Sequence, residues 1–241
     1  MSAPSNAEIL ALWERARAQG LAARAVTLLG ALSPHETLEQ RSAVSLGERD
    51  SRLLRLREQL FGAEMPSVAT CPQCRTRLEF TLNSRLLTQE NAPATVQHIK
   101  VGETELTLRP VNAGDLVAAS ACLTPGEARR VLCERCVLDA RRGDAAVAFA
   151  ALDQQIIENV SAALAAADPG AELVIDAGCA SCAHRWQLIL DVVAFLWTEI
   201  DALAHRLLSE VHALAWAYGW READILGLSE ARRRFYLERV C

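Results

Sequence analysis

Three Cys-x-x-Cys pairs constrain the fold of this chain more than any other feature of its sequence. They are CPQC at 71–74, CERC at 133–136 and CASC at 179–182. Two cysteines at this spacing can bind one metal ion from a tight turn, and two such turns supply the four sulfurs of a tetrahedral site. The question is which two pairs meet.

The sequence around each pair suggests the answer. CPQC is followed by RLEFTL, and CASC by HRWQLIL, both of which alternate as a strand does. CERC lies instead inside ARRVLCERCVLDARR, a helical pattern that follows the capping box TPGE at 124–127. Two turns that each lead into a strand are the arrangement of a zinc ribbon, whereas small buried thiols are common on core helices.

We therefore expect one structural zinc ion, closed across the 104 residues that separate CPQC from CASC, with CERC in a core. CERC as a ligand pair stays as the less favoured alternative. The expected metal ligands are Cys71, Cys74, Cys179 and Cys182.

Each turn has one unfavourable residue. The position after the second cysteine often needs a left-handed backbone, which favours glycine. Here Arg75 and Ala183 occupy it, so the affinity for metal is expected to be reduced.

Catalytic zinc and redox chemistry are weaker interpretations of the same residues. A catalytic zinc needs an open position and usually a histidine or carboxylate ligand, and His184 is the nearest histidine. We expect His184 to be an ordinary polar residue of a short strand. A thioredoxin-like dithiol would open a helix, but CPQC precedes a strand.

Composition limits the function further. The 241 residues are 51% hydrophobic and 23% charged, with a net charge of −5, which is typical of a globular protein and argues against a broad nucleic-acid surface. No signal-like segment begins the chain, and no run approaches the ~18–20 apolar residues of a membrane span. We expect a cytoplasmic protein without membrane contact, where thiols stay reduced.

Helical patterns flank the paired cysteines. Residues 7–31 predict helix with a break at Gly20, and DSRLLRLREQLFG predicts a helix capped by Asp50 and ended by Gly62. Residues 96–110 predict a hairpin that turns at Gly102. The helix that contains CERC is expected to run toward Arg141, followed by a helix at 147–166 and a strand at 172–176.

The longest predicted element begins at Asp191 and covers about 28 residues at the 3.5-residue spacing of a heptad pattern. Gly219 should end it, and two short helices follow, the second capped by Ser229. Its apolar stripe is Val193, Trp197, Ile200, Ala204, Leu207, Val211, Leu214 and Tyr218.

These elements predict a mainly α (α+β) fold: a helical bundle with a small zinc-ribbon β element, a β-hairpin and a long C-terminal helix. The expected parts are an N-terminal helical region at 1–66, a zinc-ribbon module at 67–190 and a C-terminal helical region at 191–241. The ribbon module carries an inserted hairpin and helical subdomain at 84–170.

Other motifs carry little chemistry. The sequence has no glycine-rich phosphate loop, no nucleophile elbow and no His-Glu-x-x-His helix. His205 and His212 share a helix face that we expect to be solvated, and the run Arg232–Arg234 is expected to be a solvated helix end. Nothing in these residues indicates an enzyme.

Six segments follow one another in a characteristic order: ALWERARAQGLAARAVTLL at 11–29, LGERDSRLLRLREQLFG at 46–62, CPQCRTRLEF, ELTLRPVNAGDL at 105–116, CASCAHRW, and 195–238, which includes YGWREADIL. In this order they resemble the T-even-type bacteriophage base plate protein family over almost the whole chain.

The resemblance implies a non-enzymatic part in building or forming the baseplate of a contractile phage tail or contractile injection system. Its partners would be baseplate hub or wedge proteins, and the knuckle cysteines of the family correspond to Cys71, Cys74, Cys179 and Cys182. Two alternatives of other classes remain. One is a zinc-ribbon regulator that binds nucleic acid through Arg232–Arg234, and the other is a thiol redox protein.

Overall fold

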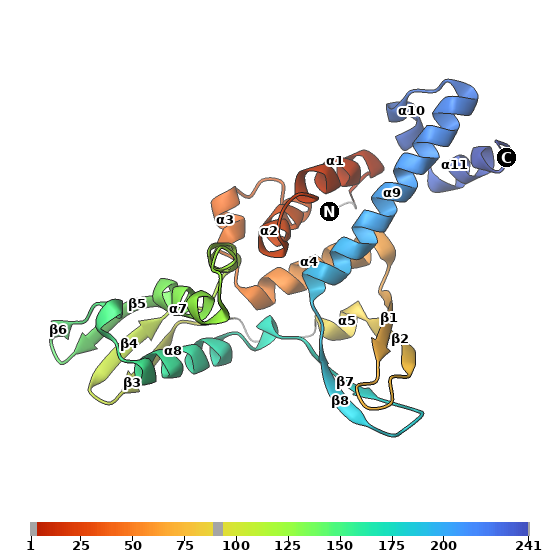
Figure 1. The fold of residues 1–241 in the computed structure, drawn as a ribbon. Coiled ribbons are helices and arrows are strands. Elements are labelled where there is room, and N and C mark those ends of the chain that lie inside the picture. The colour runs from red at the N-terminus through yellow and green to blue at the C-terminus, as the bar shows by residue number, and fades with distance from the viewer. Residues whose placement is uncertain (1–3, 89–93, 241) are drawn as a thin grey trace.

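The computed structural model describes residues 4–88 and 94–240 and has the expected α+β architecture. Figure 1 shows three parts: a group of N-terminal helices crossed by one long helix, a lobe of sheet and helices on the opposite side, and two hairpins that extend away from the helices. Within the described residues, no helix is long and apolar enough to cross a membrane.

The main core lies between the N-terminal helices and the long helix near the C-terminus. α1 (Asn6–Ala16), α2 (Leu21–Leu32), α4 (Leu46–Phe61) and α9 (Val192–Tyr218) pack against one another there. Its most buried side chains include Leu28, Leu29, Leu53, Leu54, Leu56, Met65, Leu196, Ile200, Leu207 and Leu214. Chain segments from both ends of the sequence therefore form one hydrophobic core.

Local signals set most helix ends. Ser5 and Glu8 form a capping box at the start of α1, and Gly20 is the N-cap of α2, which confirms the predicted break. Gly62, with a φ of 86°, ends α4 as predicted.

The predicted start of α4 at Asp50 is wrong. Ser45 is the N-cap, and its hydroxyl accepts a hydrogen bond from the Glu48 backbone. Asp50 is instead buried within the helix, where its carboxylate accepts two hydrogen bonds from Arg49, at 2.7 and 3.0 Å. Burial raises the pKa of Asp50, and the contacts with Arg49 oppose that rise only in part.

The long helix agrees closely with its prediction. Asp191 caps α9, and Gly219 ends it in a left-handed conformation. Six of the eight stripe residues are buried, whereas Trp197 is half-buried and Tyr218 is exposed. α10 (Glu222–Leu226) and α11 (Glu230–Leu237) follow, and Ser229 caps α11 as expected.

A separate lobe lies between the two hairpins in sequence. Its antiparallel sheet has the order β3-β4-β5-β6 and packs with α7 and α8 around a second core. The bounds are β3 (Gln97–Val101), β4 (Thr104–Leu108), α7 (Pro125–Cys136), β5 (Val137–Arg142), β6 (Ala145–Ala146) and α8 (Gln154–Ala167). The hairpin at 96–110 is thus confirmed as β3 and β4, but two further strands extend it.

Two predicted helices in this lobe need correction. The helix that contains CERC ends at Cys136 and does not reach Arg141, because the next residues pair as β5 with β4. The helix predicted at 147–166 begins only at Gln154, after a short turn of 3₁₀ helix, η1 (Phe149–Ala151), and the cap provided by Asp153. In the first case tertiary strand pairing overrides a continuous helical pattern.

The lobe joins the main core at the start of α4. Asp168 directly precedes η2 (Pro169–Ala171). Its carboxylate accepts a hydrogen bond of 2.9 Å from the Gly47 backbone N–H. A Cβ on Gly47 would collide with Asp168 Oδ1 and would lie 2.9 Å from the Gly170 carbonyl carbon. This glycine permits the close approach of the two parts. The short helices α3 (Leu38–Ser42), α5 (Ser84–Leu87) and α6 (Ala113–Ala119) complete the fold.

The last two elements are antiparallel hairpins that carry the paired cysteines at their tips. β1 (Glu64–Thr70) pairs with β2 (Arg77–Asn83), and β7 (Val174–Gly178) pairs with β8 (Arg185–Ile189). They form two separate two-stranded sheets. Strands were predicted at RLEFTL and at 172–176, and the second begins two residues later than expected.

Candidate metal centre

The two hairpin tips have the same backbone hydrogen bonds. In the first, the Cys71 N–H donates to the Thr76 carbonyl at 3.0 Å, and the Arg75 N–H donates to the Cys71 carbonyl at 3.0 Å. In the second, the Cys179 N–H donates to the His184 carbonyl at 2.9 Å, and the Ala183 N–H donates to Cys179 at 2.8 Å. Both turns therefore present their cysteines in the same geometry.

Both turns also require a left-handed residue after the second cysteine. Arg75 has a φ of 62° and Ala183 a φ of 59°, and they are the non-glycine residues with positive φ among those that the structure describes. This conformation costs an L-residue about 1–2 kcal/mol. The sequence-based expectation that glycine would suit these two positions is confirmed for the backbone.

The tips bring the four cysteine sulfurs together. All four Sγ atoms lie within 4.8 Å of one another, with 3.7 Å between Cys71 and Cys182 and 3.5 Å between Cys74 and Cys179. Four sulfurs at ~2.3 Å from a tetrahedral zinc are about 3.8 Å apart, so the observed spacing fits such an ion. The predicted pairing of CPQC with CASC therefore brings four potential ligands within reach of a single ion.

The cluster has an inner and an outer side. Cys71 and Cys179 are buried, whereas Cys74 is exposed and Cys182 is intermediate. A metal held here would lie under the protein surface on one side and near solvent on the other.

The surroundings shift the pKa values of the two outer thiols, Cys74 and Cys182, in opposite directions. The hydrogen bonds with Thr76, whose hydroxyl lies 3.2 Å from the sulfur, lower the pKa of Cys74 to about 6. For Cys182, the hydrogen bond with the His184 backbone lowers the pKa, but desolvation and the three neighbouring thiols outweigh it and raise the pKa to about 12. Four close thiols cannot all ionise without a cation, so metal binding here must release protons.

The hairpins have almost no buried core of their own. In residues 66–83 and 174–189, Cys71 and Cys179 are the fully buried side chains, and the inward-facing apolar residues remain partly accessible. An isolated two-stranded hairpin is marginally stable in water. Ligation of one ion by both tips would therefore supply a connection that packing does not.

The third pair lies elsewhere and in a different environment. Cys133 and Cys136 are buried on α7 in the second core, as predicted, and they are not part of the four-sulfur cluster. Burial and the nearby Asp115 charge raise the pKa of Cys136 to about 12. A thiol of this kind is protonated, and Cys136 donates a weak hydrogen bond of 3.7 Å to the Asp115 carboxylate.

A buried carboxylate beside Cys136 was not anticipated from the sequence. Asp115 is fully buried. Its carboxylate accepts hydrogen bonds of 2.6 and 2.9 Å from Arg109 and one of 2.7 Å from Arg135. Burial raises its pKa, but these arginines and the Asn112 backbone lower it more, to about 2. The available signal was the capping pattern Asn112-x-x-Asp115 at the start of α6.

The other residues singled out in the sequence have local roles. His184 stacks on Trp186 with ring centroids 5.8 Å apart and does not join the cysteine cluster. Arg233 is not solvated as predicted: it is buried and donates to Glu210 at 2.8 Å. Only Arg232 and Arg234 of that run are exposed. His205 and His212 are exposed on α9, as predicted, and the His205 ring contacts Trp13.

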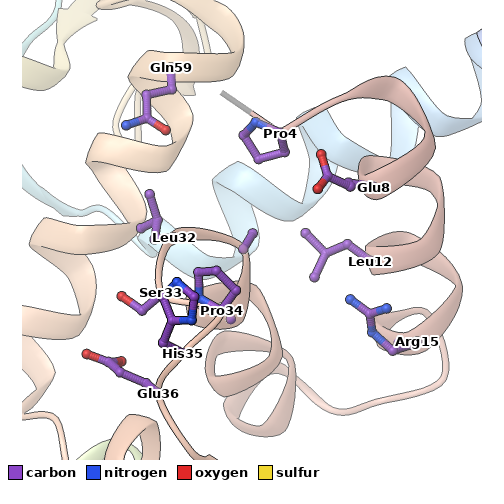
Figure 2. Close-up of a pocket in the computed structure, with 12 residues that line it drawn as sticks. Pro4, Glu8, Leu12, Arg15, Leu32, Ser33, Pro34, His35, Glu36 and Gln59 are labelled. Atoms are coloured by element: carbon purple, nitrogen blue, oxygen red, sulfur yellow. The ribbon is translucent and has the colours of Figure 1, made fainter. Parts of the chain in front are cut away.

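A surface cavity of about 630 Å³ lies between α1 and the chain that follows α2. Figure 2 shows Glu8 and Arg15 on one wall, with His35 and Glu36 opposite. Glu8 is already bonded to Ser5 at 2.7 Å, and Glu36 accepts a hydrogen bond from Arg52 at 3.0 Å. Glu8 and Glu36, the two carboxylates that line the cavity, therefore already have partners within the protein. We assign no chemistry to this cavity.

Comparison of the chain with protein-family models, with curated proteins and with solved structures finds no match. The assignment of a function therefore depends on the metal centre and on the sequence segments described above.

Proposed function

We propose that this protein is a non-enzymatic assembly or structural component of the baseplate of a contractile phage tail or contractile injection system, and that its hairpins are joined by one structural zinc ion. The observation that carries the metal part is the closed set of four sulfurs within 4.8 Å. The baseplate part is supported by the ordered resemblance of the sequence segments.

The ligand set favours a structural role for the metal. Four cysteines fill a tetrahedral site, whereas a catalytic zinc keeps one position for water or substrate. Within the described residues, the cluster of possible ligands contains no histidine or carboxylate. Tetrahedral sulfur sites select zinc or iron, and zinc has no redox chemistry of its own.

Elemental analysis of the purified protein tests the metal. We expect about one zinc per chain, lost from Cys71→Ser and from Cys179→Ser but kept in Cys133→Ser, which is the matched control because its thiol lies in the second core. A metal-free protein whose clustered cysteines form a disulfide reversibly would favour the thiol redox alternative.

Genetics and co-purification test the baseplate role. The protein should co-purify with hub or wedge subunits, and a strain without its gene should fail to make normal sheathed particles. Normal particles from the deletion strain would refute this role while leaving the metal centre intact. A steeply salt-dependent shift of DNA or RNA, lost on substitution of Arg232 and Arg234, would support the nucleic-acid alternative instead.

A further inference from the structure

A groove lies between the two hairpins, outside the metal centre. Its volume is about 310 Å³, near the lower end of the ~300–1,000 Å³ of ligand sites. It is bordered by strands β1, β2, β7 and β8 and by Phe195 at the start of α9.

The lining of this groove is uncharged. None of its twelve lining residues has an ionisable side chain, and most are aliphatic or aromatic. Two of them are large and well exposed: Val68 has 55% of its surface accessible and Ile189 has 67%. Such side chains in a concave site favour a neutral apolar ligand, because a charged group would be desolvated without a partner.

The strands contribute to the groove in two different ways. β1 supplies five consecutive residues, 66–70, and the end of β8 with the residue after it supplies 188–190. Consecutive residues of a strand point to opposite faces, so a groove that touches all of them runs along the strand edge. β2 contributes only Phe80 and Leu82, which share one face.

These edges lack partners in the structure. In the described residues, β1 pairs only with β2 and β8 pairs only with β7. Exposed edges are usually protected by lysine, other charges or proline. Residues 66–70 and 188–190 include no charge, and Pro66 is the one proline among them. The edges therefore remain open to a further strand.

We propose that this groove binds an extended, uncharged apolar segment of a partner protein, which adds as a strand along the edge of β1 and lies against β8. Five residues of β1 border the groove, and an added strand over that length spans about 17 Å. Main-chain hydrogen bonds supply affinity, and the partner's alternate side chains occupy the space beside Val68 and Ile189. The proposal does not depend on the baseplate assignment.

The test uses the full chain, purified with its metal, and a capped heptapeptide of alternating threonine and valine. Hydrogen exchange followed by NMR should show slower exchange at amides of 67–70 and at Ile189 when the peptide is added, whereas the Leu190 amide already donates to the Leu173 carbonyl. A second peptide of the same sequence, N-methylated at every backbone amide, should not bind because neither of its edges can donate the required hydrogen bonds.

Substitutions locate the site. Ile189→Glu and Val68→Glu should each weaken binding at least tenfold. Leu86→Glu is the matched control, because Leu86 is also 67% exposed but lies on α5 away from the groove, and it should leave binding unchanged.

Four results would overturn the proposal. They are no change in exchange at either edge, equal binding of the N-methylated peptide, equal binding by Ile189→Glu, or protection that grows with protein concentration in the absence of peptide. The last would assign the groove to a second copy of this chain.

Discussion

Removal of the proposed zinc ion should open the hairpins and leave the helical core folded. The ligands Cys74 and Cys179 are separated by 104 residues, and a cross-link over a loop of that size would stabilise a protein by about 4.7 kcal/mol in the chain-entropy model. The stabilisation expected from the metal in this protein is smaller than that value. α4 and α9 already pack together in the main core, and Met65 and Val192 are buried in it on either side of the hairpins.

The loop that the metal closes is therefore short. The chain between Met65 and Cys71, together with that between Cys179 and Val192, amounts to about 19 residues, for which the same model gives about 3 kcal/mol. We expect amide protection in 66–83 and 174–189 to fall about 100-fold, because 1.4 kcal/mol corresponds to a factor of ten.

Hydrogen exchange with mass spectrometry measures this directly. The metal-loaded protein, the chelator-treated protein and Cys179→Ser should be compared, with Cys133→Ser as the control that keeps the cluster. Protection of α2 and α9 should not change. An equal loss of protection in the hairpins and in α9 would refute the reasoning, since it would mean that the metal closes the longer loop.

Three further predictions concern single residues. Arg75→Gly, and likewise Ala183→Gly, should relieve the left-handed strain and tighten zinc binding by about 1 kcal/mol, roughly fivefold, in competition with a chelator; unchanged affinity would show that the turn bears no strain. Asp115→Asn should leave two arginines unpaired and cost about 3 kcal/mol of unfolding free energy in urea titrations. Because the folded-state pKa of Asp115 is depressed from 3.8 to about 2, the wild-type chain should lose about 2 kcal/mol as the pH falls from about 4 to 2, and the variant should lack that loss. Gly47→Ala should force Asp168 away from α4 and lower the melting temperature by several degrees, about 1–3 kcal/mol, whereas Gly126→Ala, with open space around it, should be neutral.

The four-cysteine cluster could be predicted because the determinants of each turn are local, and because both turns lead into a strand. Each knuckle is a short turn followed by a strand, and the turn geometry alone fixes how two cysteines point. The same locality explains why the capping box at Thr124, the glycine stops at Gly62 and Gly219, and six of the eight residues of the α9 stripe were anticipated correctly. Where a residue's role depends on its immediate neighbours, the sequence is sufficient.

The failures share the opposite cause. The helix through CERC ends at Cys136 because the residues from Val137 onward pair with β4 as strand β5. β4 is remote from this helix in sequence. Asp50 is an effective cap by type, but Ser45 begins the helix and Asp168 completes its N-terminus from 121 residues away. Asp115 gave no signal of its buried arginine pair, because Arg109 and Arg135 meet it only after the lobe has folded.

The composition of the main core has a consequence for the order in which a newly made chain can fold. α1, α2 and α4 leave the ribosome early, but the surface that covers them belongs to α9, which starts at residue 192. The lobe at 94–168 has a hydrophobic core of its own and can fold before the main core forms. The N-terminal helices must wait for the last fifth of the chain, and during translation their apolar faces are the part of the nascent protein most exposed to aggregation or to a chaperone.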